Sequence, residues 1–324
     1  MSILDRRRRP AAAALTIVAA LALAGCGGSA GANGTSTAAG PSGQTVNLSP
    51  DQHRITADKV DGIAAEVPAD VRAGGRLVIG GTAGSVPPLG FYATDDKTPI
   101  GVENDIAWLV AGVLGLQPQL EVTSWENLFV GLDSGKYQAG FSNITVTEAR
   151  KEKYDFATYR LDTLAFEAKK GGNWKVAGPK DVAGKTIAVG SGTNQEKILV
   201  SWSQQDERAG LKPVDIKYFQ NASDYYLALQ SGRIDAYLGP NPSASYHAAT
   251  SGQTEIIGTQ SGGGDLVGKI AATTKKDNGL VKPFADALNE LIRNGKYAEV
   301  LKRWGLSNEA VPTSEVNPPG LPKS

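Results

Sequence analysis

Short apolar runs alternate with amphipathic segments along the chain from about residue 76 onward. The runs have the length of strands and are rich in β-branched residues, which predicts buried strands. Between them, apolar residues recur at every third or fourth position, which predicts helices that pack on one face. Strands that alternate with helices in this way predict an α/β fold with mainly parallel sheets. The predicted strands are 76–80, 137–141, 186–189 and 234–238. The predicted helices are 105–114, 125–134, 195–203 and 223–230, followed by a long helical region over 280–304 that is broken by Gly295.

One part of this pattern occurs twice. Residues 132–139, LDSGKYQA, align with residues 229–236, LQSGRIDA, which lie 97 positions later. Each copy ends a predicted helix, places a glycine at the helix end and begins a strand. Junctions of helix, glycine and strand are common and could resemble each other by chance. The two copies are identical or conservatively matched at five of eight positions, which favours a repeat. The repeat predicts two similar lobes whose strands end at a shared crevice, where open α/β sheets bind ligands.

The first 26 residues follow a different pattern. Four arginines, Arg6 to Arg9, precede an apolar run from Ala11 to Ala24, and Gly25 and Cys26 follow. A cationic head, an apolar core and small residues at a cut site predict an export signal. The apolar run is too short to span a bilayer, which needs about 20 residues. The segment resembles a bacterial lipoprotein signal, which implies removal of residues 1–25 and lipidation of Cys26. The alternative is an ordinary secretory signal with a chance cysteine.

Two polar stretches flank the α/β pattern. Residues 27–49 consist largely of Gly, Ser, Thr, Ala, Asn and Pro without apolar periodicity, and such segments are flexible. We therefore expect a lipid-anchored flexible linker over residues 26–66. From residue 311 onward the chain contains four prolines and one glycine, so we expect an extended and loosely held tail over residues 313–324.

The composition excludes several classes of protein. Removal of residues 1–25 takes away four arginines and one aspartate, which leaves 29 basic and 32 acidic side chains and a net charge of about −3. This balance argues against nucleic-acid binding, which needs a basic face. The chain has one cysteine, which cannot form an internal disulfide, and two histidines, His53 and His247. We therefore expect no metal and no cofactor.

The residues that follow the second predicted strand suggest an anion site. Thr147 is suited to cap the start of a helix, which would place Arg150 in the first turn, where the helix dipole disfavours a cation. A bound anion would account for this position, because a guanidinium binds a carboxylate through two hydrogen bonds. Asn143 and Thr145 could add further hydrogen bonds. The alternative is a surface arginine paired with Glu148 or Asp155.

A second anion site is expected in the other lobe. Residues 189–196 run from a predicted strand into a helix, and Thr193 and Glu196 have the spacing of a capping box. The backbone amides of a helix start bind anions readily. The pair Gly190 and Gly192 lacks the third glycine of a dinucleotide-binding motif, because Gln195 occupies that position.

Several segments, taken in order, resemble the bacterial family 3 solute-binding proteins, which serve polar amino acid ABC transporters. The resemblance covers about residues 77–306 and implies a two-lobed periplasmic-binding-protein fold of type II, in which two crossing strands form a hinge. It implies a first lobe built from residues 67–168 and 271–312 and a second lobe from residues 169–270. The segments are 101–106, 132–139, 145–150 with Phe156, and 295–305.

The resemblance also implies roles for individual residues. Arg150 matches the arginine that binds the ligand carboxylate, and Asn143 and Thr145 match its hydrogen-bonding neighbours. Gly192, Thr193 and Asn194 match the contribution of the second lobe. Trp125 matches a wall of the pocket, although a core tryptophan on an amphipathic helix is an equal alternative.

The chain departs from the family pattern where an α-ammonium group would bind. Pro240 stands where binders of α-amino acids usually carry an aspartate, and Asn241 follows it. Val86 replaces a frequent aromatic residue, and Ala83 stands where binders of basic amino acids often have an aspartate. A buried ammonium without a partner costs several kcal/mol. Either Glu103 or another carboxylate takes over this role, or the ligand is not a standard α-amino acid.

These observations predict a lipid-anchored solute-binding protein of an ABC importer that captures an amino acid or related small carboxylate by closure of its lobes. We expect a monomer held outside the cell membrane by lipidated Cys26, with the permease as its partner and no catalytic activity. One alternative is an enzyme on the same scaffold, similar to cyclohexadienyl dehydratase, with Glu103 and Glu196 as candidate acids or bases. Another is an extracellular sensor domain.

Overall fold

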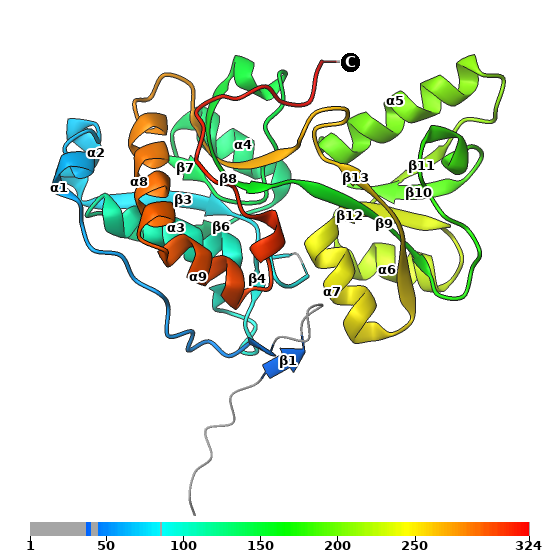
Figure 1. Ribbon diagram of the computed structural model, residues 1–324, viewed down its shortest axis with the longest axis horizontal. Helices are drawn as coiled ribbons and strands as arrows, with labels where there is room; N and C mark the ends of the chain where they lie inside the picture. Colours follow the sequence, from blue (N-terminus) through cyan, green and yellow to red (C-terminus); the bar gives the residue numbers. More distant parts are fainter. Residues whose placement is uncertain (1–36, 40–44, 85, 324) are drawn as a thin grey trace, which may run out of the picture. The chain divides into compact units, whose positions relative to one another are not determined.

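The computed structural model describes residues 37–39, 45–84 and 86–323, all of which belong to one structural unit. The predicted export signal, residues 1–25, and Cys26 lie outside the described residues. Figure 1 shows two α/β lobes, one carrying α3, α4, α8 and α9 and the other carrying α5, α6 and α7. The predicted α/β class with two lobes is confirmed.

The two lobes are built on sheets of the same topology. Each sheet has five strands, of which three neighbours are parallel and the last two pair in an antiparallel manner. The first sheet has the order β6 (Gln117–Val122), β3 (Arg76–Gly81), β7 (Ala139–Gly140), β14 (Lys269–Lys275) and β8 (Tyr154–Leu161). The second has the order β11 (Asp215–Tyr218), β10 (Thr186–Val189), β12 (Ala236–Pro240), β9 (Thr163–Lys169) and β13 (Thr254–Ser261).

The sequence repeat lies at equivalent places in the two sheets. Its first copy ends α4, passes through Gly135 and enters β7, and its second copy ends α6, passes through Gly232 and enters β12. Both glycines adopt a positive φ, of 76° and 73°, which other residues adopt only with strain. Both β7 and β12 are the third strands of their sheets. The expected similarity of the two lobes is therefore present in the structure.

Helices cover both faces of the first sheet because successive side chains of a strand point to opposite faces. Leu77 and Ile79 of β3 are fully buried in a core with α3, α8 and α9, whereas Val78 packs on the other side against the cluster that contains Leu128 and Leu132 of α4. The helices of this lobe are α1 (Asp61–Ala64), α2 (Ala69–Gly74), α3 (Val102–Val113), α4 (Trp125–Ser134), α8 (Val281–Arg293) and α9 (Lys296–Arg303).

The second lobe has a smaller core and a separate aromatic cluster. Phe166 of β9 stacks on Trp202 of α5, with ring centroids 5.7 Å apart. On the other face of the sheet, Tyr225 of α6 stacks on Tyr237 of β12 at 3.7 Å. The helices of this lobe are α5 (Asn194–Arg208), α6 (Ala222–Gln230) and α7 (Asn241–Ser251). Short elements elsewhere are β1 (Thr37–Ala39), β2 (Thr45–Asn47), β4 (Phe91–Tyr92), β5 (Pro99–Ile100), η1 (Arg150–Glu152), η2 (Pro179–Val182) and η3 (Ser307–Glu309).

The chain crosses between the lobes twice. The first crossing is at Asp162, between β8 and β9, and the second is over residues 262–268, between β13 and β14. The expected boundary after residue 168 therefore differs from the structure, where all of β9 belongs to the second sheet. The apolar pattern runs through residues 154–169 almost without interruption, so it contains no local sign of the crossing.

Part of the expected flexible linker is packed on the first lobe. Val46 is buried, and Ile55, Val60 and Ile63 pack against the core of that lobe. Arg54 forms an ion pair with buried Asp105. Among the described residues, the segment 45–66 therefore differs from a free linker, because scattered apolar residues give it enough buried surface to hold it in place.

The C-terminal residues also differ from the expected loose tail. Residues 314–323, which we call the C-terminal strap, run beside β8 and are drawn in red in Figure 1. Asn317 accepts from the Phe156 N–H at 2.8 Å and donates to Asp155 at 2.9 Å. Leu321 pairs through its backbone with Val146 and Glu148 of the first lobe, while its buried side chain packs in the core of the second. The prolines make the strap extended, and the hydrogen bonds hold it down.

Candidate functional site

A cavity of about 340 Å³ lies between the two lobes, within the usual range of ligand pockets of about 300–1,000 Å³. It is formed where the parallel strands of both sheets reach their carboxyl ends, the position at which α/β sheets bind ligands. The first lobe lines it with Thr82, Gly84, Leu89, Gly90, Glu103, Thr123, Ser124, Trp125, Glu126, Ser142 and Asn143. The second lobe lines it with Gly190, Ser191, Thr193, Asn194, Gln195, Phe219, Gln220, Asn221, Ala222, Tyr225, Tyr237, Leu238 and Pro240.

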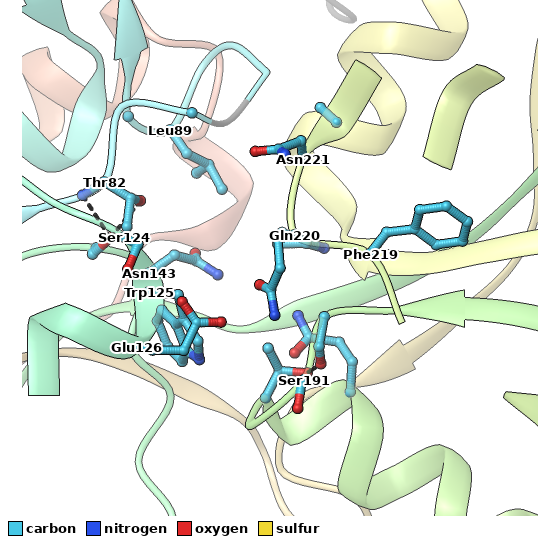
Figure 2. Close-up of a pocket in the computed structure, with 18 of the residues that line it drawn as sticks. Thr82, Leu89, Ser124, Trp125, Glu126, Asn143, Ser191, Phe219, Gln220 and Asn221 are labelled. Carbon is cyan, nitrogen blue, oxygen red and sulfur yellow. Dashed lines mark hydrogen bonds between the residues drawn. The ribbon is translucent and has the colours of Figure 1, made fainter. Parts of the chain in front are cut away.

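Hydrogen bonds between strand ends shape the floor of the cavity in the first lobe. The Thr82 N–H, directly after β3, donates to the Ser142 hydroxyl after β7 at 3.1 Å. The two hydroxyl oxygens of these residues are 2.7 Å apart. Figure 2 shows the first of these contacts and places Asn143 beside it, with its side chain directed toward the second lobe. The two neighbouring strand ends are thus held together beneath the ligand space.

Arg150 is not among the residues that line the cavity, but it connects the two lobes next to Trp125, which is. It is the first residue of η1, and its Nη1 donates to the Thr145 carbonyl at 2.9 Å. Its Nη2 donates to the Gly192 carbonyl of the second lobe at 3.1 Å. The guanidinium carbon lies 5.1 Å from the ring centroid of Trp125 and 5.4 Å from that of Phe129. Burial lowers the pKa of Arg150 to about 10, and the charge of Asp162 opposes this effect. Arg150 therefore keeps its positive charge at neutral pH.

The start of α5 faces Arg150 from the second lobe. The predicted cap is confirmed, because the Thr193 hydroxyl accepts from the Glu196 N–H at 3.2 Å and donates to the Gly190 carbonyl at 2.7 Å. The Glu196 carboxylate accepts from the Gly192 N–H at 2.6 Å. Gly192 has a φ of +72°, so the tight turn before the helix requires glycine. The turn presents the Gly192 carbonyl to Arg150 and the first amides of α5 toward the cavity.

Thr145 and Asn194 meet at the first crossing instead of pointing freely into the cavity. The Thr145 hydroxyl donates to Asp162 Oδ2 at 2.7 Å, and Asn194 Nδ2 donates to the same oxygen at 2.9 Å. Asn194 Nδ2 also contacts the Gly262 carbonyl at 3.0 Å. Burial raises the pKa of Asp162, while the bonds from Thr145 and Asn194 and the charges of Arg160 and Arg150 oppose the rise. Both side chains thus join the lobes to Asp162, which the sequence pattern did not reveal.

Glu103 lines the cavity, but its carboxylate is held in a buried network. Its side chain is 1% exposed and accepts from Arg160 Nη2 at 2.7 Å, from the Asn143 N–H at 2.9 Å and from the Tyr159 hydroxyl. Arg160 is also 1% exposed and forms a second ion pair with Glu309. Asn143 adopts a φ of +51°, which asparagine tolerates better than most residues, and its Oδ1 accepts from Arg160. The network orients Asn143 and neutralises Glu103.

Trp125 lies in the wall of the cavity, which is one of the two positions expected for it. It is partly buried and meets Phe129 edge to face, with ring centroids 5.0 Å apart. Asn241 is placed differently, because its Oδ1 accepts from Ser245 Oγ at 3.0 Å within α7. The preceding residue, Pro240, lines the cavity in its place.

An aromatic and amide-rich wall in the second lobe was absent from the sequence prediction. The Tyr226 hydroxyl donates to buried Glu167 at 3.0 Å, and its ring stacks on His247 at 3.5 Å. These contacts fix the neighbouring Tyr225 and Tyr237, which line the cavity. Two adjacent tyrosines in a predicted helix were a signal, but their partners are distant in the sequence. The loop after β11 adds Phe219, Gln220 and Asn221 to this wall.

In residues 37–39, 45–84 and 86–323, no group of three or more His, Cys, Asp or Glu side chains gathers in a geometry that could hold a metal ion. Over the same residues, each helix is too short or too polar to cross a membrane.

The candidate acids of the enzymatic alternative are both engaged in structural contacts. Glu103 is paired with Arg160, and Glu196 binds the Gly192 N–H at the start of α5. General acid–base catalysis requires a group that reaches the reacting proton. Each of the two carboxylates thus has a structural role in the described part of the chain.

Two α/β lobes of equal topology, two crossings and a cavity at the strand ends define the class of type II periplasmic binding proteins. A family model of bacterial extracellular solute-binding proteins, family 3, matches residues 78–307. The chain belongs to this family, so it is a solute-binding protein, and the resemblance seen in its motifs is confirmed.

Similar proteins bind several different amino acids. The L-cystine-binding protein TcyJ of Escherichia coli strain K12 is 28% identical over 235 residues, which are 72% of this chain and 84% of that protein. The arginine-binding protein ArgT of Corynebacterium glutamicum is 27% identical over 266 residues, which are 82% of this chain and 85% of that protein. Among solved structures, the arginine-, lysine-, histidine-binding protein ArtJ from Geobacillus stearothermophilus matches with a TM-score of 0.60 and 26% identity, over 71% of this chain and 94% of that chain.

Proposed function

We propose that this protein is a lipid-anchored receptor of an ABC importer, and that it captures an amino acid or a related small carboxylate between its lobes. Arg150 binds the ligand carboxylate, and the first amides of α5 complete the anion site from the opposite lobe. The captured solute then passes to a permease at the cell membrane. The names of similar proteins support an amino acid as the solute.

The contact that carries this proposal is the hydrogen bond from Arg150 to the Gly192 carbonyl. A cation that reaches across to a main-chain oxygen of the other lobe is well placed to bind a carboxylate there instead. A carboxylate adds an opposite charge and can accept two parallel hydrogen bonds from a guanidinium, whereas the Gly192 carbonyl is neutral and accepts one from it. A ligand can favour closure only through contacts that it makes better in the closed state. Arg150 and the start of α5 supply such contacts.

Binding to the purified protein tests the capture of a carboxylate. Isothermal titration and tryptophan fluorescence, to which Trp125 contributes, are measured with arginine, cystine and glutamine. Arg150→Gln removes the charge at similar length and lowers the affinity by about ten-fold or more, as expected for the loss of a charged hydrogen bond. Arg208→Gln, at the exposed end of α5, is the matched control and leaves the affinity unchanged. Equal affinity in the Arg150→Gln variant would contradict the proposal.

The lipid anchor is tested separately. Cys26→Ala in the full chain removes the proposed lipidation site. We expect the wild-type protein in the membrane fraction and the variant in the soluble extracytoplasmic fraction. Equal membrane association of both forms would exclude the anchor without affecting the proposed binding of a solute.

A further inference from the structure

The charged residues near the cavity indicate which charges a ligand could carry. Arg150 contacts the lining residue Trp125 without lining the cavity itself, and under the proposed function it and the start of α5 account for one negative group. Two acidic residues line the cavity, Glu103 and Glu126, and none of its described lining residues is basic. Glu103 is already neutralised by Arg160. Glu126 is therefore the remaining lining carboxylate in the described part of the chain whose charge a ligand could match.

Glu126 is placed to meet a cation close to the carboxylate site. It is exposed and lies in the first turn of α4, directly after Trp125. In the described residues its carboxylate forms neither an ion pair nor a hydrogen bond. Trp125, the residue before Glu126, contacts the Arg150 guanidinium, which lies 5.1 Å from its ring centroid. Figure 2 shows the Glu126 side chain beside Trp125, facing the space in front of Gln220.

A second, independent observation comes from the opposite lobe. The side chain of Gln195 lines the cavity and is only 6% exposed, yet its Oε1 has no hydrogen-bond partner among residues 37–39, 45–84 and 86–323. A buried acceptor without a partner is unfavourable, typically by the cost of a lost hydrogen bond. A ligand that carries N–H donors would satisfy it. The cavity is thus lined by an exposed carboxylate from one lobe and by Gln195 from the other, whose buried amide oxygen has no partner among the described residues.

We propose that Glu126 and Gln195 bind the ammonium group of an amino acid whose carboxylate is held by Arg150. This inference rests on the proposed function and identifies the ligand as a zwitterion. The ammonium takes the place between the lobes, so that closure brings Gln195 to it and shields Glu126 from water. Position 240 then needs no aspartate, because Glu126 of α4 supplies the negative charge that binds the ammonium.

Glu126 has another role that the test must separate from binding. An acidic residue in the first turn stabilises a helix through its dipole, so its replacement can lower stability without any effect on a ligand. For this reason the readout is the difference between two ligands that share a carboxylate and differ only at nitrogen. Arginine and glutamine are each compared with their N-acetyl derivatives, which keep the carboxylate and lose the ammonium charge.

The experiment measures the affinities of these four probes and of cystine by isothermal titration. We expect the wild-type protein to bind the free amino acids about ten-fold or more tightly than the acetylated forms. Glu126→Gln removes most of this preference by weakening the free amino acids alone, and Glu126→Asp retains part of it. Glu207→Gln, on the exposed end of α5, changes the net charge equally and leaves the preference intact. Gln195→Leu reduces the affinity for the free amino acids.

Three results would overturn the inference. These are acetylated probes that bind as tightly as the free amino acids, an effect of Glu126→Gln no larger than that of Glu207→Gln, or no binding of any free amino acid. The Arg150→Gln variant separates this inference from the proposed function. If it binds as the wild type does while Glu126→Gln is impaired, the carboxylate site is misassigned but the ammonium site stands. If the reverse holds, the proposed function stands and the role of Glu126 is refuted.

Discussion

Arg150 donates to the Gly192 carbonyl over 3.1 Å and so joins the two lobes directly. The same guanidinium donates to the Thr145 carbonyl of its own lobe at 2.9 Å. Two acceptors in different lobes are reached by one planar group with several N–H donors. This geometry requires arginine and not only a positive charge.

Arg150→Lys tests this requirement. Lysine keeps the charge but presents a single ammonium, so it cannot hold both acceptors in the fork geometry. We expect a loss of about 1.5–3 kcal/mol in ligand binding, the value of one charged hydrogen bond, which is about 10- to 150-fold in affinity. Isothermal titration provides the measurement. Full affinity in this variant would show that charge alone is sufficient.

Arg160→Met is expected to destabilise the first lobe. Arg160 is buried between Glu103 and Glu309, and its loss leaves two buried carboxyl groups without their cation. Breaking a buried ion pair in this way costs about 3–5 kcal/mol. Denaturant unfolding measures the effect, and Arg233→Met at an exposed position is the control, with a change within about 0.5 kcal/mol. A small effect of Arg160→Met would mean that the network adds little to stability.

Glu309 makes the stability of the fold depend on pH. Burial raises its pKa from 4.5 to about 7, although Arg160 opposes the rise, and its Oε1 has no hydrogen-bond partner among the described residues. A carboxyl whose pKa is higher in the folded chain stabilises the fold fully below pH 4.5, and this contribution is lost as pH rises through about 7.

Glu309→Gln isolates this effect, because glutamine is neutral at every pH. Between pH 5 and pH 8, we expect the free energy of unfolding of the wild type to fall by on the order of 1–3 kcal/mol more than that of the variant. Urea unfolding at the two pH values measures the difference. Parallel pH profiles of the two proteins would show that Glu309 stays ionised throughout.

Leu321→Ala tests whether the C-terminal strap stabilises the protein. The Leu321 side chain is 7% exposed and packs in the core of the second lobe. Its truncation is expected to cost about 2 kcal/mol, the lower end for a buried leucine. Val316→Ala serves as the control, because Val316 is 45% exposed and its truncation changes stability by less than about 0.5 kcal/mol. Equal stability of the two variants would contradict a structural role for the strap.

Much of the fold could be predicted from local sequence patterns. The strand predicted at 186–189 and the helix predicted at 125–134 have the same bounds in the structure. Alternation of apolar residues and glycine at helix ends are local signals, so they can be recognised in one sequence. The crossing at Asp162 left no such signal, because residues on both sides of it have the composition of a strand. The packing of residues 45–66 was missed because its apolar residues are scattered.

The candidate site divides in the same way. The cap at Thr193 could be predicted because it stands at a recognisable helix start. Thr147 accepts from the Arg150 N–H at 3.1 Å, but the helix expected there is only the three-residue η1, and the role of Arg150 toward a ligand stays a prediction. The network around Glu103 could not be predicted, because its partner Arg160 is 57 positions away in the sequence, and Glu309, the second partner of Arg160, is 206 positions away from Glu103. Tyr225 and Tyr237 likewise depend on contacts between a helix and a strand. Long-range contacts thus account for what sequence patterns did not reveal.

The C-terminal strap offers a position for a label that could report on ligand capture. The last ten described residues are attached to one half of the hinge by hydrogen bonds, and Leu321 is inserted into the other half. Lys323 pairs with Glu152, two residues after Arg150, so a fluorescent dye at this position would sit at the joint and beside the proposed carboxylate site. Such a labelled protein would serve as an optical sensor whose signal follows each capture event.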